Sequence, residues 1–173
     1  MARLLTRVDL RDVAYTGIAA GMIFMGFEMI ATTLVTGSAA APMPLRMIAG
    51  IVMGQTALDP SYPLFAAGMI GLVVHLLLSI AFAAIFAEIV TRVERATEGE
   101  LMSSGTQLAL AGTVFGAALW LVNFYVVAPL AGWTWFPENV HHIVAFLGHA
   151  FFFGCPLGWM FGSAGHLSLV RAR

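Results

Sequence analysis

The sequence predicts an all-α polytopic membrane protein, a bundle of four transmembrane helices arranged as two tandem helical hairpins. Of the 173 residues, 60% are hydrophobic and 10% are charged, whereas a soluble domain carries about 25% charged residues. Four apolar runs are each long enough to cross a bilayer, which takes about 20 helical residues. They cover residues 13–36, 64–87, 107–128 and 143–163, and the formal charge within them is Glu28. We therefore expect residues 1–173 to form a single membrane domain in contact with the lipid bilayer.

The placement of the arginines predicts the orientation of the spans. Seven of the eight basic residues lie before the first span, between the second and third, or after the fourth: Arg3, Arg7, Arg11, Arg92, Arg95, Arg171 and Arg173. Arg46 lies on the other side. Because basic loops tend to stay in the cytoplasm, both termini and residues 88–106 are predicted to be cytoplasmic. The loops at 37–63 and 129–140 are then outside.

The two outer loops differ in length and composition. Residues 37–63 contain four prolines, which bracket the apolar stretch 45–58. This pattern predicts a short interfacial or re-entrant helix within the long outer loop. The shorter loop contains Trp133, Trp135 and Phe136. Since Trp is enriched at membrane–water interfaces, these rings are expected to form an aromatic belt at the level of the lipid head groups.

The first and third spans share a pattern that indicates an internal repeat. Three glycines and one polar residue recur in register at an offset of 95 residues, as Gly17, Gly21, Glu28 and Gly37 and then as Gly112, Gly116, Asn123 and Gly132. The second and fourth spans each carry one deep histidine. The pattern places repeat 1 at about 13–90 and repeat 2 at about 107–165. Parallel repeats of this kind are related by a pseudo-two-fold axis along the membrane normal.

One polar residue from each span is expected at the same depth. With a rise of 1.5 Å per residue, Glu28, His75, Asn123 and His149 fall roughly 4–8 Å to the outer side of the midplane. At 100° per residue, the glycine pairs of the first and third spans lie within about 20° of Glu28 and Asn123. Since small residues mark close helix contacts, the four side chains are predicted to converge inside the bundle as a polar layer.

The polar layer admits three interpretations. An ionisable residue at this depth is costly unless it is paired. The first interpretation is therefore a hydrogen-bonded clamp, in which a neutral histidine or a protonated Glu28 bonds Asn123 or Ser79 and contributes about 0.5–1.5 kcal/mol to helix association. The second is a cofactor or metal site. The imidazoles of His75 and His149 suit a haem iron, with Arg46 reaching the propionates, whereas His75, His149 and Glu28 together suit zinc, copper or iron. The third is a proton or ion relay. At the outer mouth, His141 and His142 are placed to deliver an ion.

The fourth span has a second face, formed by Gly154, Gly158 and Gly162. This glycine ridge lies about 140° from His149 around the helix, and it predicts close contact with another helix. The partner is either a neighbour within the bundle or a second polypeptide. Cys155, which lies beside the ridge, is expected to serve in packing because the chain has no other cysteine.

Taken together, the spans resemble the YagU-like group and related uncharacterised four-span inner-membrane proteins of bacteria and archaea. The likeness lies in "GIAAGMIFMGF" of the first span, "HLLLSIAFAAIFA" of the second, "GTVFGAALWLVNFYVVAPLAGWTWF" of the third, with Gly112, Gly116, Trp120, Pro129 and Gly132, and "HAFFFGCPLGWMFG" of the fourth. The resemblance implies the four-span topology and a bacterial-type cytoplasmic (inner) membrane. It implies no activity, and Glu28 is not part of the shared pattern.

The sequence carries no nucleotide-binding loop, no nucleophile with an adjacent base and no basic patch suited to nucleic acid. It predicts a small, non-enzymatic integral membrane protein, an accessory or scaffold subunit that assembles with itself or with other membrane subunits. The first alternative is a haem- or transition-metal-binding protein for electron transfer or ion handling. The second is a proton or ion relay. Whether the chain is an enzyme, and whether it holds a cofactor, stays open at this point.

Overall fold

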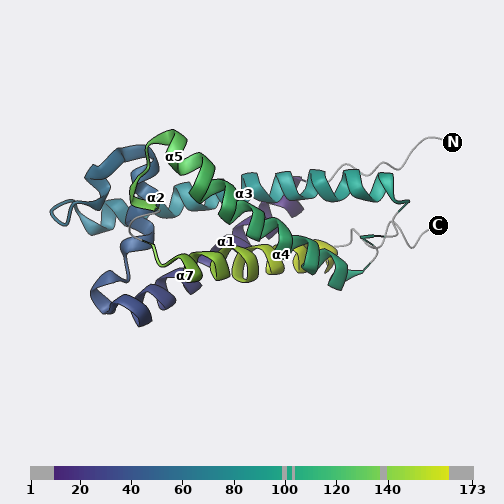
Figure 1. The fold of residues 1–173 in the computed structure, drawn as a ribbon, viewed down its shortest axis with the longest axis horizontal. Helices are drawn as coiled ribbons and strands as arrows, with labels where there is room; N and C mark the ends of the chain where they lie inside the picture. Colours follow the sequence, from purple (N-terminus) through teal and green to yellow (C-terminus); the bar gives the residue numbers. More distant parts are fainter. Residues whose placement is uncertain (1–9, 99–100, 103, 137–139, 164–173) are drawn as a thin grey trace.

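Four long helical segments run side by side, and shorter helices join them at one end of the bundle (Figure 1). The computed structural model describes residues 10–98, 101–102, 104–136 and 140–163. Within these ranges all regular secondary structure is helical. The four segments are α1 (Leu10–Thr36), α3 (Leu64–Ala96), Gly105–Ala131 and His142–Phe161, and each is long and apolar enough to cross a membrane. The predicted all-α, four-span membrane protein is confirmed at this level.

The third and fourth segments each contain a wider, π-helical turn. In the third, α4 (Gly105–Val122) passes into η3 (Asn123–Val127) and then α5 (Ala128–Ala131). In the fourth, α7 (His142–Leu147) passes into η4 (Gly148–Gly154) and then α8 (Cys155–Phe161). A proline follows each wide turn, Pro129 and Pro156. Proline has no N–H to donate and its ring clashes with the carbonyl four residues earlier, and a π turn is one way for a helix to accommodate both.

The long outer loop folds into η1 (Ser38–Ala40), α2 (Met43–Met53) and η2 (Gly54–Leu58). α2 packs along α3, and a Cβ on Gly71 of α3 would collide with the Leu45 carbonyl. Trp135 holds the other side of α2, because its Nε1 donates to the Met47 carbonyl at 3.1 Å and its ring covers Gly50. Only 5% of Trp135 is exposed. The aromatic-belt prediction is therefore wrong for this residue, since Gly50 leaves room for the ring and Met47 satisfies its N–H.

Arg46 fixes the return from α2 to α3. Its buried guanidinium donates to the carbonyls of Ala57 and Asp59 from Nη1, at 2.8 and 2.9 Å, and to that of Tyr62 from Nη2, at 2.8 Å. In the same turn, Asp59 accepts the Ser61 N–H at 2.7 Å. Hydrogen bonds with Ser61 hold the pKa of the Asp59 carboxyl below its ordinary value. Arg46 is thus occupied in building the loop.

Glycines bring the helices together in two pairs. A Cβ on Gly17 of α1 would lie 2.9 Å from the Ile80 Cα of α3. In the other pair, a Cβ on Gly112 of α4 would collide with the Gly154 carbonyl, and one on Gly158 would collide with the carbonyl of Leu108. The glycine ridge of the fourth span therefore packs against α4 within the same chain.

The apolar core fills one half of the bundle. Its largest fully buried side chains are Phe86, Val90, Leu108 and Leu157, and they lie where α3 ends, α4 begins and α8 ends. α1 begins at the same end (Figure 1). Arg11, Arg92 and Arg95 lie at this end too. The orientation prediction also rests on Arg3, Arg7, Arg171 and Arg173, which lie outside the described residues.

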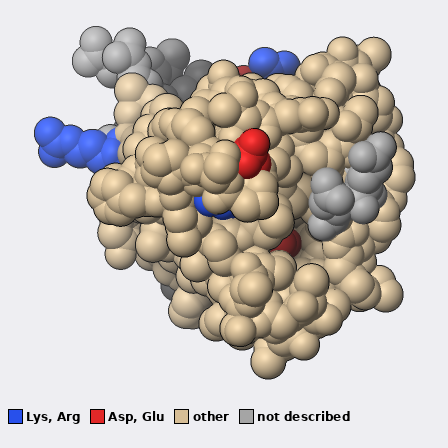
Figure 2. All heavy atoms as spheres, turned by 90° about the vertical axis from the view of Figure 1, so that its left-hand side faces the viewer, with Lys and Arg blue, Asp and Glu red and all other residues tan. Residues whose placement is uncertain are grey.

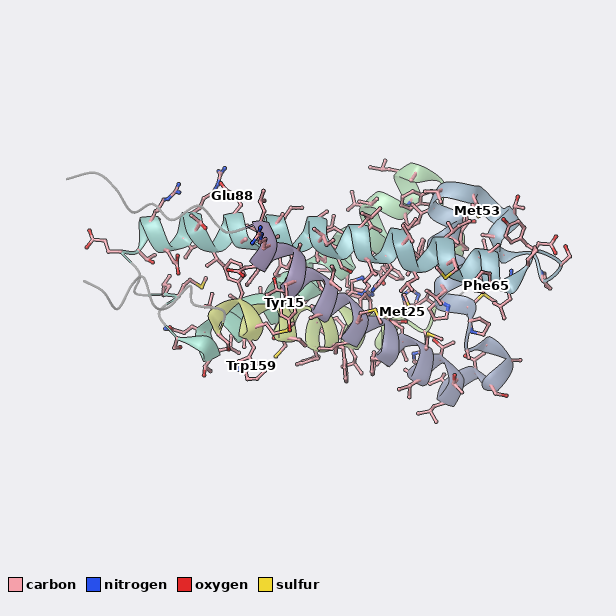
Figure 3. All side chains as sticks on the ribbon, turned by 180° about the vertical axis from the view of Figure 1, so that it is seen from behind. Tyr15, Met25, Met53, Phe65, Glu88 and Trp159 are labelled. Atoms are coloured by element: carbon pink, nitrogen blue, oxygen red, sulfur yellow. The ribbon has the colours of Figure 1, made fainter. Side chains whose placement is uncertain are left out.

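The surface matches a bilayer environment. Viewed from the end that carries α2 and α5, the molecule shows few charged groups, and an acidic group is visible in a hollow of this face (Figure 2). Along the sides of the bundle, large apolar and aromatic side chains such as Tyr15, Phe65 and Trp159 are exposed, whereas Met25 is buried in the interior (Figure 3). Lipid is the solvent that such a surface favours.

Candidate functional site

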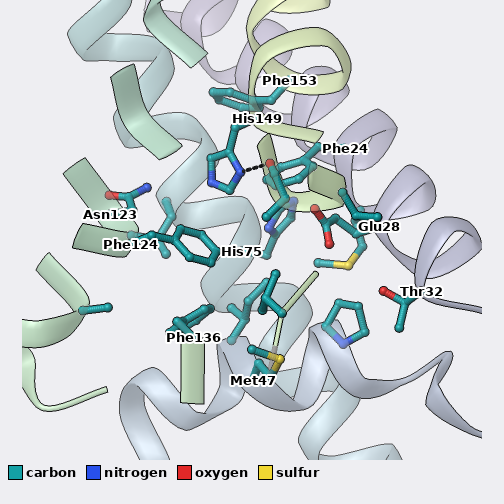
Figure 4. A pocket seen from close by; sticks show the side chains of 18 of the residues that line it. Phe24, Glu28, Thr32, Met47, His75, Asn123, Phe124, Phe136, His149 and Phe153 are labelled. Carbon is teal, nitrogen blue, oxygen red and sulfur yellow. Dashed lines mark hydrogen bonds between the residues drawn. The ribbon is translucent and has the colours of Figure 1, made fainter. Parts of the chain in front are cut away.

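A cavity of about 350 Å³ borders the apolar core, with which it shares Leu119 and Phe153, and extends towards α2. Glu28, His75, Asn123 and His149, one from each span, all line it (Figure 4). The remaining lining side chains are mostly apolar and come from all four spans and from α2. The structure thus brings the four residues of the predicted polar layer to one cavity.

His75 ties α3 to α1 across this space. Its buried ring donates from Nε2 to the Gly21 carbonyl at 2.8 Å, because a carbonyl oxygen can only accept. Ser79, one turn further along α3, donates to the His75 carbonyl at 2.8 Å. A Cβ on Gly21 would lie 2.5 Å from the Ser79 Oγ. The interhelical bond of His75 therefore depends on glycine at this position of α1.

His149 makes its hydrogen bond through Nδ1 and to a residue of its own helix. Nδ1 donates to the Ala145 carbonyl at 2.8 Å. In the neutral imidazole, Nε2 then carries a lone pair and is an acceptor. The ring packs edge-on against Phe24 and Phe124, with centroid separations of 4.6 and 5.7 Å. His149 thus offers the cavity a hydrogen-bond acceptor between two aromatic rings.

Glu28 brings a carboxylate into the same space. Its Oε1 is buried, and the described part of the chain offers this atom no hydrogen-bond partner. The carboxylate lies against Gly148, where an added Cβ would come within 2.6 Å of Oε1 and 2.5 Å of the Phe24 ring. Since a buried polar atom without a partner is costly, Glu28 is the unsatisfied group of the cavity.

Aromatic rings form much of the cavity wall. The lining includes Phe24, Phe82, Phe124, Trp133, Phe136 and Phe153. Phe24 contacts both imidazoles, with its ring centroid 5.5 Å from that of His75 and 4.6 Å from that of His149. These rings were not among the predicted site residues. Phe24 had a usable signal, because it precedes Glu28 by four residues and so shares its helical face.

The residues predicted at the outer mouth separate in the structure. His141 lines the cavity, whereas His142 does not and instead lies with its Nδ1 3.4 Å from the Tyr125 hydroxyl. A constant 100° per residue places His142 on the face of His149, but His142 is the first residue of α7 and is exposed. Arg46 is absent from the described cavity lining, because its guanidinium is bound to the loop carbonyls.

The geometry does not favour a metal or haem centre. Within the described ranges, no three His, Cys, Asp or Glu side chains stand close enough to hold one metal ion, so Glu28, His75 and His149 share the cavity without converging on one point. A haem iron needs a lone pair from each imidazole, but the Nε2 of His75 donates to Gly21 and Phe24 lies against both rings. Arg46 is also unavailable to a propionate.

No family model matches the chain, and no curated protein or solved structure matches it either. The resemblance to the YagU-like group stays a prediction.

Proposed function

We propose that the chain is a multi-pass membrane protein that binds a small, mainly apolar molecule with a polar end in the cavity of its bundle. The observation that carries the proposal is the joint lining of the cavity by Glu28, His75, Asn123 and His149 amid apolar walls. Binding sites for small molecules are typically concave and apolar, with a few placed polar groups and volumes of about 300–1,000 Å³. At about 350 Å³, this cavity is within that range.

The cavity adds a specific site to the function expected from the sequence. An accessory or scaffold subunit needs helix contacts with its partners but no hollow interior, and tight packing is the ordinary state of a protein core. The accessory role, in association with other membrane subunits or with a second copy, stays a prediction, and ligand binding is compatible with it. The proton or ion relay also stays a prediction.

We place the cavity in the extracytoplasmic half of a bacterial-type inner membrane. The support is the grouping of Arg11, Arg92 and Arg95 at the end of the bundle opposite the cavity, where basic residues favour the cytoplasm. In this orientation both termini are cytoplasmic. His141 then stands at the extracytoplasmic mouth, and a ligand enters from the outside or from the outer leaflet.

We further propose that the two helix pairs are tandem repeats of one hairpin. Corresponding glycines act alike in the two pairs: a Cβ on Gly21 would meet His75 and Ser79, and one on Gly116 would meet the backbone of His149. The third glycine of each set also has the same role, since Gly37 and Gly132 follow the ends of their helices with φ of 105° and 72°. Left-handed conformations of this kind favour glycine.

A matched pair of substitutions in α1 tests ligand binding. Thr32 lines the cavity, and Thr32→Trp fills part of it; Leu34, two residues on, is 80% exposed on the bundle surface. Overpacking costs about 1–3 kcal/mol, so the larger side chain is expected to lower occupancy roughly 5- to 150-fold. Leu34→Trp is expected to leave the ligand occupancy unchanged. The measurement is native mass spectrometry of each purified protein, with identification of small molecules in the organic extract.

Two outcomes would contradict ligand binding in this cavity. A wild-type protein that carries no small molecule from its native membrane, or one whose bound molecule is retained equally by both tryptophan variants, does not use this cavity for binding. In that case the accessory role is the remaining prediction.

A further inference from the structure

Glu28 is an acidic side chain inside the bundle whose charge no described residue balances. Its Oε1 is buried beside the cavity without a hydrogen-bond partner in the described chain. Ionisable side chains within a membrane are costly and usually have a partner. Here the partner is missing although the carboxylate is held in place against Gly148 and Phe24.

The chain supplies no cation to this carboxylate from its described residues. Arg46 is bound to the carbonyls of Ala57, Asp59 and Tyr62. Arg11, Arg92 and Arg95 lie towards the opposite end of the bundle, and no arginine is among the described residues that line the cavity. An anionic ligand therefore meets the carboxylate of Glu28 and no arginine on the described cavity wall, which disfavours it.

The surroundings of Glu28 suit a positive charge. The Phe24 ring borders the same point beside Gly148 as the Glu28 Oε1, and a cation within about 6 Å of an aromatic ring is attracted by the π face. The neutral imidazole of His149 offers an Nε2 acceptor on the other side of Phe24. The carboxylate and the adjacent Phe24 ring match an ammonium group, which has donors and no acceptor.

On the basis of the proposed function, we infer that the ligand is a lipophilic amine. Its protonated nitrogen pairs with Glu28 beside Phe24, and its apolar body lies along the remaining aromatic wall, among Phe82, Phe124 and Phe153. The ammonium supplies the partner that Glu28 lacks among the described residues, and the exclusion of water strengthens the pairing. Each component of this recognition is a side chain on the cavity wall.

Three probes of nearly the same shape test the charge preference: 4-phenylbutylamine, 4-phenylbutanol and 4-phenylbutyrate. At neutral pH the amine is cationic, the alcohol neutral and the acid anionic. Equilibrium dialysis of the full chain in lipid nanodiscs, with empty nanodiscs subtracted, gives each affinity. We expect the amine to bind most tightly. Glu28→Gln, which keeps the shape of the side chain, is expected to weaken amine binding roughly 10- to 100-fold and to leave the alcohol nearly unchanged.

Glu88→Gln is the matched control, because Glu88 pairs with Arg92 on the exposed end of α3 and is remote from the cavity. It should leave all three affinities at wild-type values. An alcohol that binds as tightly as the amine, or a Glu28→Gln variant that keeps the preference for the amine, overturns the inference and leaves the proposed function standing. If none of the three probes binds and Thr32→Trp displaces no native molecule, the proposed function itself is overturned.

Discussion

At the scale of the residue, the two deep histidines differ in the bonds they make. His75 donates from Nε2 to Gly21 on another helix, whereas His149 donates from Nδ1 to Ala145 on its own. The first bond joins two spans, and the second fixes the orientation of a ring. His75 therefore clamps two helices through the backbone carbonyl of Gly21 and not through Asn123 or Ser79, the expected partners, while His149 keeps an acceptor for the cavity.

Replacing His75 tests its role as a clamp. His75→Leu removes the donor to Gly21 and keeps an apolar side chain of moderate size. Interhelical hydrogen bonds in membrane proteins contribute about 0.6 kcal/mol on average and up to about 1.7 kcal/mol. We expect the free energy of unfolding to fall by about 1 kcal/mol, as measured by reversible unfolding in mixed detergent micelles.

His142→Leu is the control for this change, since His142 is exposed and makes a long 3.4 Å contact with Tyr125. Its expected effect on unfolding is close to zero. Equal losses for the two leucine variants would show that the His75 bond contributes nothing specific to the association of α1 with α3.

At the scale of the element, the apolar runs and the glycine spacing carried most of the information. Run length predicted the four spans, and the pairs Gly17–Gly21 and Gly112–Gly116 predicted faces where helices meet. What the pattern could not give was the local path of the third and fourth spans. Both prolines lie inside apolar runs or at their edges, so hydropathy does not register the π turns at η3 and η4.

The two wide turns also explain why some cavity residues escaped prediction. Projecting side chains at 100° per residue assumes a constant helix, whereas a π turn adds a residue and rotates everything beyond it. Phe124 lies in η3 and reaches His149 through such a turn. The cavity itself depends on the volumes of side chains from all four spans, from α2 and from the loop before α7, which no periodicity along one helix can express.

A second matched pair of substitutions, Gly112→Ala and Gly26→Ala, tests the close packing of helices at glycine. A Cβ on Gly112 would collide with the Gly154 carbonyl, whereas one on Gly26 would have no atom within 4 Å. Gly112→Ala should therefore force α4 away from η4 and lower the free energy of unfolding by about 1–3 kcal/mol. Gly26→Ala should be neutral or stabilising by up to about 1 kcal/mol, because alanine favours the helix.

The same unfolding measurement in detergent micelles compares the two alanine variants. A Gly112→Ala protein as stable as Gly26→Ala would contradict the close backbone contact between α4 and the fourth span. It would also remove one support for the proposed tandem repeat, which assigns Gly17 and Gly112 the same role.

At the scale of the whole molecule, the bundle is packed at one end and hollow at the other. The core around Phe86 and Leu157 occupies the half where α3 ends. The cavity lies towards the other end, where α2, held by Trp135, forms part of its wall. A rigid half can hold the helices in register while the other half keeps space for a ligand, so the loop anchored by Arg46 is part of the site's support.

Cysteine labelling tests whether the hollow end faces outwards. Cys155 is the chain's one cysteine, so Cys155→Ala gives a background without thiols. Ser61 and Ala96 are exposed at opposite ends of α3. We expect a membrane-impermeant maleimide to label Ser61→Cys in intact bacterial cells and Ala96→Cys only after permeabilisation, because the arginines near Ala96 favour the cytoplasmic side for that end. The unsubstituted background controls for other reactions of the reagent. Labelling of Ala96→Cys but not Ser61→Cys in intact cells would invert the topology and turn the cavity towards the cytoplasm.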